Sequence, residues 1–201
     1  MRMSGKERRE QLLDVGRSLF AEKGFEATST EEIAARAAVS KPIVYEHFGG
    51  KEGLYAVVID REMQRLLDLF TGALTAGEPR ALLEQAALAL LTYIEDESDG
   101  FRILVRDSPV ASSSGTFSSL LNDIASQVEY ILAREFASRG FEPKLAGLYS
   151  QALVGMVALT GQWWLEVRRP KRDEVAAQLV NLAWNGLSHL DPKPKLVTRE
   201  R

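Results

Sequence analysis

The side chains best suited to specific recognition lie in one short stretch, residues 41–47. On a helix, Val44 and Phe48 share one apolar face, so lysine, isoleucine, tyrosine, glutamate and histidine point the other way. These side chains have no evident reason to be exposed on a helix that serves only the fold. Lysine donates hydrogen bonds to guanine, glutamate accepts one from cytosine, and tyrosine or histidine reaches phosphate. The pattern therefore predicts a helix that reads duplex DNA.

A second short helical pattern precedes this helix and must position it. Thr30 is a good N-cap, two glutamates follow where the helix dipole favours acids, and the helix is predicted to end near Ala37. The turn 38–40 comes next, and Pro42 stands in the first turn of the second helix, where its missing N–H costs little. Two helices joined by such a turn can insert one helix into the major groove.

The run TEEIAARAAVSKPIVYEHFGGK, residues 30–51, closely resembles the DNA-binding motif of the TetR family of bacterial transcription regulators. Tyr45, His47, Phe48 and Lys51 stand at the spacings of that motif. The preceding run LLDVGRSLFAEKGFEATS is similar to the family's opening pattern of apolar pairs, Gly-Phe and a Thr/Ser-rich approach. The motif-level resemblance covers about the first quarter of the chain, and the rest shares only length and an all-helical pattern.

The resemblance implies an all-α fold of about nine helices, with an N-terminal three-helix helix-turn-helix domain and a C-terminal helical domain for ligand binding and dimerisation. It also implies a homodimeric repressor that binds a palindromic operator and is released when a small apolar ligand fills the C-terminal domain. One position departs from the family pattern, because glycine is frequent in the turn where this chain has Ala38. An L-residue in the left-handed conformation costs roughly 1–2 kcal/mol, so either the turn differs or the core absorbs that cost.

The predicted DNA contacts are Thr30, Ser40, Lys41, Pro42, Ile43, Tyr45, Glu46, His47 and Lys51. Lys41 and Glu46 are the candidates for base readout, while Pro42 and Ile43 offer apolar contact to thymine methyl groups.

Most of these positions also have a structural interpretation. Tyr45 can serve as half-buried packing, and His47 can cap the helix C-terminus, where a cation is favoured. Thr30 can cap its own helix, which does not exclude a phosphate bond. Lys51 begins the next helix, where a cation opposes the dipole, so phosphate binding explains it better. The arginine pair at 8–9 either reaches phosphate or is solvated near the start of the chain.

Composition is that of an ordinary globular protein, with 201 residues of which 45% are hydrophobic and 26% charged. No apolar run approaches the roughly 18 residues of a membrane helix, so no membrane partner is expected. The N-terminus MRMSGKERRE lacks the apolar core of a signal peptide, and the chain has no cysteine. A bacterial cytoplasm is therefore the expected location, at the nucleoid when DNA-bound.

Charge is distributed unevenly. The net charge is −3, whereas residues 1–51 hold nine Lys/Arg and eight Asp/Glu, a local balance of +1. Phosphate binding normally leaves a basic footprint, and this one is small. We therefore expect a sequence-specific DNA binder with limited nonspecific affinity.

Helical periodicity recurs along the whole chain, and no strand pattern of useful length is present. Helices are predicted at about residues 5–23, 30–37, 41–48, 51–74, 80–96, 100–107, 117–139, 143–168 and 171–190. The small polar residues of 108–115 predict a flexible connection. We assign 1–50 to the helix-turn-helix domain, 51–190 to the ligand-binding and dimerisation domain, and 191–201 to a disordered tail.

Polar residues within otherwise apolar helices of the larger domain predict a small-molecule site, because ligand cavities are apolar with a few polar groups. The candidate lining residues are Phe70, Tyr93, Phe101, Arg102, Arg106, Asn122, Tyr149 and Trp163. The two arginines can instead form surface salt bridges with Glu95, Asp96 or Asp99. The segments EDESDGFRILVRD and WNGLSHL resemble a subset of actinobacterial regulators that sense long-chain acyl thioesters, which implies a long-chain acyl or other apolar effector.

The last two long helices are apolar on more than one face. Their candidate dimer-interface residues are Met156, Leu159, Leu179, Leu182 and Trp184. The alternative is that these residues belong to an intrachain core. If two copies pair here, two recognition helices face successive major grooves about 34–36 Å apart, which predicts a palindromic operator.

Other functional classes fit less well. With His47 and His189 as the only histidines, no cysteine and no GxxxxGK loop, the chain offers few candidates for an enzyme site. We therefore predict no cofactor, no metal and no catalytic residues. An all-α protein-interaction module that does not bind DNA is the alternative function.

Overall fold

The structure is a computed structural model that describes residues 3–74, 77–106 and 117–196. These residues form nine α-helices, one 3-10 turn and no strand, which confirms the all-α class. The helices are α1 Gly5–Lys23, α2 Thr30–Arg36, α3 Lys41–Phe48, α4 Lys51–Ala73, α5 Pro79–Asp96, α6 Ser98–Val105, α7 Phe117–Ser138, α8 Ala146–Val167 and α9 Arg172–Ser188, with the 3-10 turn η1 at Pro143–Leu145. Residues 191–196 follow α9 without helix or strand, whereas the predicted connection 108–115 and tail residues 197–201 lie outside the described residues.

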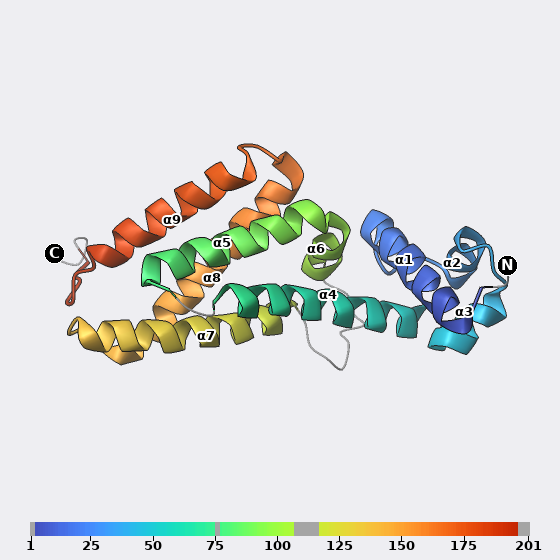
Figure 1. The fold of residues 1–201 in the computed structure, drawn as a ribbon, viewed down its shortest axis with the longest axis horizontal. Coiled ribbons are helices and arrows are strands. Elements are labelled where there is room, and N and C mark those ends of the chain that lie inside the picture. Colours follow the sequence, from blue (N-terminus) through green and yellow to red (C-terminus); the bar gives the residue numbers. More distant parts are fainter. Residues whose placement is uncertain (1–2, 75–76, 107–116, 197–201) are drawn as a thin grey trace.

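The molecule is elongated, with α1, α2 and α3 at one end and α5, α7, α8 and α9 at the other (Figure 1). We call the first three helices the head and the larger group the body. Helix α4 begins in the head at Lys51 and continues along the body. Helix α6 lies between the two groups and packs on both α1 and α4. The head is therefore joined to the body through α4 and through the contact of α6 with α1.

The helix-turn-helix differs from the sequence prediction at its first cap. Ser29, not Thr30, is the N-cap of α2, because its hydroxyl accepts a hydrogen bond from the Glu32 N–H at 3.1 Å. Thr30 is instead the first helical residue and is buried. Ala38 has a φ of 52°, so the turn adopts the left-handed conformation and the alanine carries its steric cost.

Helix α3 is placed on the head by one fully buried side chain. Val44 has no exposed surface, and Pro42 lies in the first turn, as predicted. The helix ends at Gly49, whose φ of 73° suits a residue without a side chain. The short helix thus presents its remaining faces outward.

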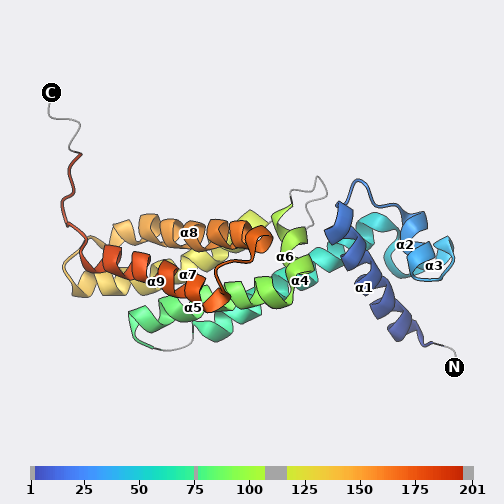
Figure 2. The ribbon, with the colours of Figure 1, turned by 90° about the horizontal axis from the view of Figure 1, so that it is seen from above.

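The body is a bundle in which α7 packs along α8 and α5 packs along α9 (Figure 2). Helix α8 approaches α5 closely at Gly161, where an added Cβ would stand 2.7 Å from the Cδ1 atom of Ile94. Among the described residues, no helix combines the length and the apolar character needed to cross a membrane.

Candidate nucleic-acid interface and apolar cavity

The outward face of α3 carries the side chains that the sequence predicts as DNA contacts. Tyr45 is 49% exposed, and Lys41 and Glu46 are exposed beside it. Pro42 is also exposed at the start of the helix. Exposure of a large aromatic side chain next to a lysine is compatible with contact to a nucleic acid.

Of the other predicted contacts, Ser40 is exposed and the rest are partly or fully buried. Ile43 is partly buried against the core, and His47 is partly buried with its ring beside that of Phe48. Ser40 is the exposed N-cap of α3, and its side chain makes no capping hydrogen bond. Thr30, at 9% exposure, presents little side-chain surface to a ligand.

Lys41 has an intramolecular partner. Its ammonium group forms an ion pair with Glu31 of α2 and lies 5.8 Å from the centre of the Tyr45 ring. The hydrogen bond from Lys41 lowers the pKa of Glu31, and the same bond raises the pKa of Lys41. The cation at the start of α3 is therefore already balanced by an acid in the free protein.

Two further cations near the C-terminal end of α3 bind backbone carbonyls of the head. Arg9 donates from Nη1 to the His47 carbonyl at 2.7 Å and lies over the Phe48 ring, 4.3 Å from its centre. Lys51 donates to the Phe25 carbonyl at 3.1 Å, with its Nζ 4.1 Å from the centre of the Phe25 ring. Arg9 binds a carbonyl of the last turn of α3, a role that sequence reasoning missed because residues 9 and 47 are far apart in the chain.

Most other basic side chains at this end of the molecule are also paired with acids. The ion pairs are Lys23 with Glu32, Arg36 with Glu22, and Arg61 with Glu10. Arg8 donates to Gln11 at 2.7 Å rather than to an acid. The head therefore has a modest basic footprint, in agreement with its near-neutral charge.

A cavity of about 100 Å³ lies in the body and is lined mainly by aliphatic side chains of α4, α5, α7, α8 and α9. On α4 and α5 its walls include Leu66, Phe70, Leu83 and Leu90. Trp184 of α9, predicted at the dimer interface, instead lines this cavity. A space this apolar suits an effector with a hydrocarbon body.

The polar side chains at the cavity wall are few and close together. Glu135 and Arg139 stand one turn apart near the end of α7. Arg139 donates from both terminal nitrogens to the carbonyls of Leu187 and Ser188, at 3.4 and 3.2 Å, near the end of α9. The two charged side chains therefore stand where α7 and α9 end, and those ends are the ones away from the head (Figure 1).

Of the predicted ligand-lining residues, Phe70 alone lies on this cavity. Tyr93 and Phe101 are buried in the core, with ring centres 6.3 Å apart. Arg102 pairs with Asp99 at 3.8 Å, which is the structural alternative considered from the sequence. Arg106 donates to the Phe20 carbonyl at 3.2 Å and so ties α6 to α1.

The remaining predicted ligand contacts lie on other surfaces. Asn122 is exposed on α7 and accepts from Gln151 at 3.3 Å. Tyr149 is partly buried with its ring against Phe136, 5.3 Å away. Trp163 is 51% exposed. Asn122 and Tyr149 each contact a residue of the facing helix and do not line the cavity, so the cavity has a less polar wall than the sequence suggested.

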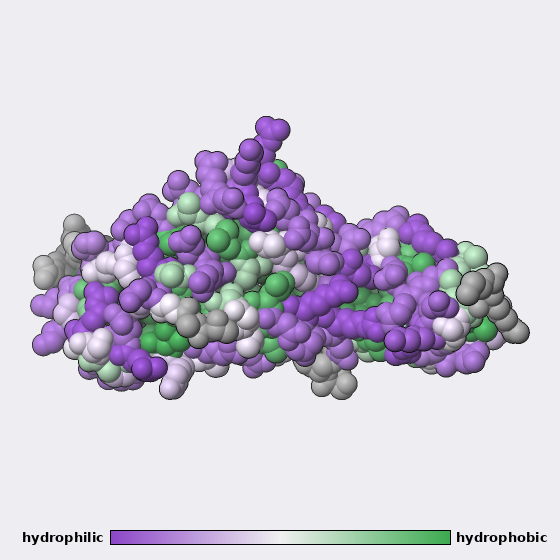
Figure 3. Space-filling model, in the orientation of Figure 1, coloured by the Kyte–Doolittle hydropathy of each residue, from purple (hydrophilic) through white to green (hydrophobic). Residues whose placement is uncertain are grey.

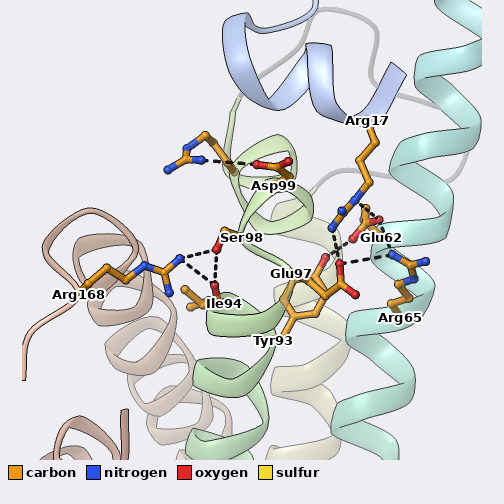
Figure 4. A network of polar contacts seen from close by, with 10 residues as sticks. Arg17, Glu62, Arg65, Tyr93, Ile94, Glu97, Ser98, Asp99 and Arg168 are labelled. Atoms are coloured by element: carbon orange, nitrogen blue, oxygen red, sulfur yellow. Dashed lines mark hydrogen bonds and ion pairs between the residues drawn. The ribbon is translucent and has the colours of Figure 1, made fainter. Parts of the chain in front are cut away.

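A polar network occupies the junction between head and body (Figure 4). Glu62 of α4 is only 1% exposed, and it accepts from Arg17 of α1 at 2.9 Å, Arg65 at 3.0 Å and the Tyr93 hydroxyl at 2.6 Å. Arg17 also pairs with Glu97 at 2.5 Å. Burial lowers the pKa of Arg17, but the charges of Glu62 and Glu97 outweigh it and raise the pKa overall. The network therefore connects α1, α4 and the end of α5.

The outer surface of α8 and α9 carries exposed apolar side chains. Leu159, Trp163 and Leu182 are 66%, 51% and 65% exposed. Of the other predicted interface residues, Leu179 is buried and Met156 is partly buried. In the view of Figure 3, hydrophobic surface is likewise interspersed among polar residues over the body. Leu159 and Leu182 are thus the exposed residues of the predicted interface. Together with Trp163, which the sequence assigned to the ligand site, we call them the apolar stripe of α8 and α9.

Two family models match this chain, one in its N-terminal part and one in its C-terminal part. The family model of bacterial regulatory proteins of the tetR family matches residues 12–58, and the model of a tetracyclin repressor-like C-terminal domain matches residues 69–196. The HTH-type transcriptional activator FasR of Mycolicibacterium smegmatis is 32% identical over 196 residues, which cover 94% of this chain and 87% of that protein.

Two further comparisons agree. An HTH-type transcriptional repressor of Mycobacterium tuberculosis is 29% identical over 168 residues, covering 82% of this chain and 85% of that protein. The crystal structure of a TetR-like regulator from Rhodococcus sp. RHA1 superposes with a TM-score of 0.74 at 27% identity, covering 94% of this chain and 100% of that one. The chain therefore belongs to the tetR family of bacterial regulatory proteins and is a DNA-binding transcriptional regulator, not an enzyme.

Proposed function

We propose that the protein is a homodimeric, ligand-responsive repressor that binds a palindromic operator and leaves it when an apolar effector fills the body. The observation that carries this proposal is that α4 belongs to both the head and the body. The same helix starts beside α3 in the head and lines the cavity with Leu66 and Phe70 in the body. A change in the cavity wall therefore acts on the element that positions the head.

The effector is an apolar compound of the long-chain acyl type. Aliphatic side chains form most of the wall, and Glu135 and Arg139, the charged side chains that line it among the described residues, lie near the ends of α7 and α9. This arrangement suits a molecule whose hydrocarbon body enters and whose polar end stays near α7 and α9. Burial of a hydrocarbon chain is favourable by about 0.8 kcal/mol per methylene group.

Effector binding must widen the cavity. Its volume is about 100 Å³, whereas sites for drug-sized ligands occupy roughly 300–1000 Å³. Entry of the effector therefore separates α4 from its neighbours and favours a second arrangement of the helices. An effector shifts this equilibrium only by its difference in affinity for the two arrangements.

Dimerisation uses the apolar stripe of α8 and α9. Leu159, Trp163 and Leu182 expose apolar surface, and Gly155 and Gly186 have open space where a side chain would stand. Small residues allow two pairs of helices to approach closely, and a two-fold interface presents the two copies of α3 to successive major grooves. This geometry supports a palindromic operator.

The test begins with selection of duplex DNA from a random library by the purified full-length protein. We expect an inverted repeat with half-site centres one helical turn apart, and repression of transcription in vitro when that repeat overlaps a promoter. Stimulation of transcription from such a template would show that the protein is an activator and not a repressor. Native mass spectrometry of the same preparation identifies any co-purified apolar compound, whose addition is expected to release the DNA.

A variant separates DNA binding from the alternative of a protein-interaction module. Tyr45→Ala is expected to abolish binding to the selected DNA while folding and dimerisation persist, because the Tyr45 side chain is 49% exposed. Lys51→Ala is less suitable, since Lys51 also binds the Phe25 carbonyl. Wild-type protein that selects no consensus would favour the alternative function.

A further inference from the structure

The polar network at the junction lies directly beyond the inner end of the cavity. Leu66 and Leu90 line the cavity on α4 and α5. Glu62 precedes Leu66 by one turn of α4, and Tyr93 follows Leu90 by nearly one turn of α5. On these two helices Glu62 and Tyr93 therefore lie between the cavity-lining leucines and the head, and Arg17 of the head points toward them (Figure 4).

The hydrogen bond between Tyr93 and Glu62 has a fixed direction. Tyr93 is 1% exposed, and its hydroxyl donates to Glu62 Oε2 at 2.6 Å. Burial raises the pKa of the Tyr93 hydroxyl, and the charge of Glu62 raises it further, so the hydroxyl keeps its proton. The other oxygen, Oε1, accepts from Arg17 of α1 and from Arg65. One carboxylate thus links a residue beside the cavity to a residue of the head.

The carboxylate of Glu62 packs directly against α6 at Gly100. A Cβ added at Gly100 of α6 would stand 1.9 Å from Glu62 Oε2 and 2.7 Å from the Tyr93 hydroxyl. The end of α6 also reaches the head, because Arg106 donates to the Phe20 carbonyl. A displacement of Tyr93 or of α6 must therefore alter the contacts of Glu62.

We propose that Glu62 is a positioning residue for the DNA-binding head, and that Tyr93 transmits occupancy of the cavity to Arg17 through it. The proposal rests on the proposed function, since it assigns the path by which the effector acts. In the ligand-free state the contacts from Tyr93 through Glu62 to Arg17 hold α1 in the orientation that binds DNA. A ligand that displaces Tyr93 at the inner end of the cavity weakens these contacts, and α1 then leaves that orientation.

A purely structural role for the network predicts a different result. Loss of one partner from a buried charge cluster lowers stability whatever the cluster does. Transmission requires in addition that Arg17 and Tyr93, which lie on different helices and meet through Glu62, act on DNA binding as one unit. A double-mutant cycle distinguishes the two roles.

The experiment measures binding of the selected duplex DNA by ligand-free protein carrying Tyr93→Phe, Arg17→Gln or both. We expect each single variant to bind DNA about five- to tenfold more weakly, within the usual range of coupling between sites. The double variant should bind DNA no more weakly than the weaker-binding single variant, since either substitution interrupts the same series of contacts. Tyr149→Phe is the matched control, because that tyrosine packs on Phe136 elsewhere in the body and should leave DNA binding unchanged.

A second measurement follows the orientation of the head without DNA. The chain has no cysteine, so Ala35→Cys, at an exposed position of α2, provides one spin-label site per protomer. The distribution of distances between the two labels of a dimer should broaden in the Tyr93→Phe and Arg17→Gln proteins and stay narrow in the Tyr149→Phe protein. Thermal unfolding of each variant shows that the measured populations are folded.

Three outcomes overturn the proposal: wild-type DNA affinity in both single variants, additive losses in the double variant, or an unchanged distance distribution. Failure of the proposed function is recognised separately, since wild-type protein would then select no DNA sequence or give no distance between labels. The two conclusions can therefore fail independently.

Discussion

At the scale of single residues, the proposed DNA-binding surface is already partly neutralised by acids of the protein itself. Lys41, at the start of α3, forms an ion pair with Glu31, and neighbouring cations have similar partners. If Lys41 leaves Glu31 for a DNA phosphate, the counterion released from DNA is offset by one taken up at Glu31. The gain from nonspecific phosphate binding is therefore small, whereas contacts to base edges keep their full value.

Glu31→Gln is expected to raise affinity for random-sequence duplex DNA severalfold. The freed Lys41 then releases a counterion on binding, so the slope of log K against log salt should steepen by about 0.9 per protomer. Fluorescence anisotropy at a series of salt concentrations measures both quantities. Glu26→Gln removes the same charge from an exposed loop position and is the control. Equal slopes for the Glu31 variant and the wild type would contradict the role given to this pair.

Ala38→Gly is expected to stabilise the protein by about 0.5–1 kcal/mol. Ala38 has a φ of 52°, which costs an L-residue roughly 1–2 kcal/mol, while glycine costs about 0.5–1 kcal/mol through the entropy of the unfolded chain. Urea unfolding measures the difference. Ala35→Gly, at an exposed position inside α2, should lose about 1 kcal/mol instead. A loss of stability at position 38 would show that the turn is not strained.

At the scale of elements, the inner part of the body depends on close contact between α5 and α8. Gly161 of α8 faces Ile94 and Leu90 of α5, so that α8 lies closer to α5 than a side chain at this position would permit. Leu90 also lines the cavity, and Ile94 follows it by one turn. The separation of α5 and α8 thus helps to set the width of the cavity.

Gly161→Val is expected to lower the free energy of unfolding by about 2 kcal/mol, in the range of overpacked cores. The added Cβ would stand 2.7 Å from Ile94 Cδ1, an atom inside the core. Gly72→Val, on the exposed side of α4 where no atom lies within 4 Å of the new Cβ, should change stability little. Chemical denaturation compares the two, and a similar stability for both variants would mean that α8 can withdraw from α5 without cost.

At the scale of the whole molecule, the proposed function requires two surfaces that lie far apart, one for DNA and one for a second copy of the chain. The outward face of α3 lies at one end of the elongated molecule, while α8 and α9 belong to the other (Figures 1 and 2). In the proposed dimer each head contacts one half-site, so the body has to join two copies for a palindromic operator to be bound.

Leu159→Glu is expected to convert the dimer into a monomer and to weaken operator binding by at least about a hundredfold. Leu159 is 66% exposed on the proposed interface, and a buried carboxylate without a partner costs several kcal/mol there. Light scattering after size-exclusion chromatography gives the molar mass. Leu69→Glu, at a 41% exposed leucine of α4, is the control and should remain dimeric. A dimer that persists in the Leu159 variant would place the interface elsewhere.

The helices and the helix-turn-helix were predictable because their signals are local. Helical periodicity placed Val44 on the buried face of α3, and the structure leaves it without exposed surface. The predicted N-cap was wrong by one residue, because Ser29 and Thr30 both carry a hydroxyl group that can cap a helix. Ser29 has the extended backbone that the N-cap of α2 requires. Neighbours within one turn decide such features, and the sequence displays those neighbours directly.

The cavity and the junction network were decided by packing between distant segments. Tyr93 resembles a ligand contact in the sequence, because a polar residue interrupts an apolar helix; its partner Glu62 lies on α4 and already satisfies it. Arg17 likewise meets Glu97 across 80 positions of the chain. The amino-acid order alone determined the class of fold and the position of the helix-turn-helix. A buried polar group needs a partner, and only the arrangement of whole helices determines which partner comes within reach.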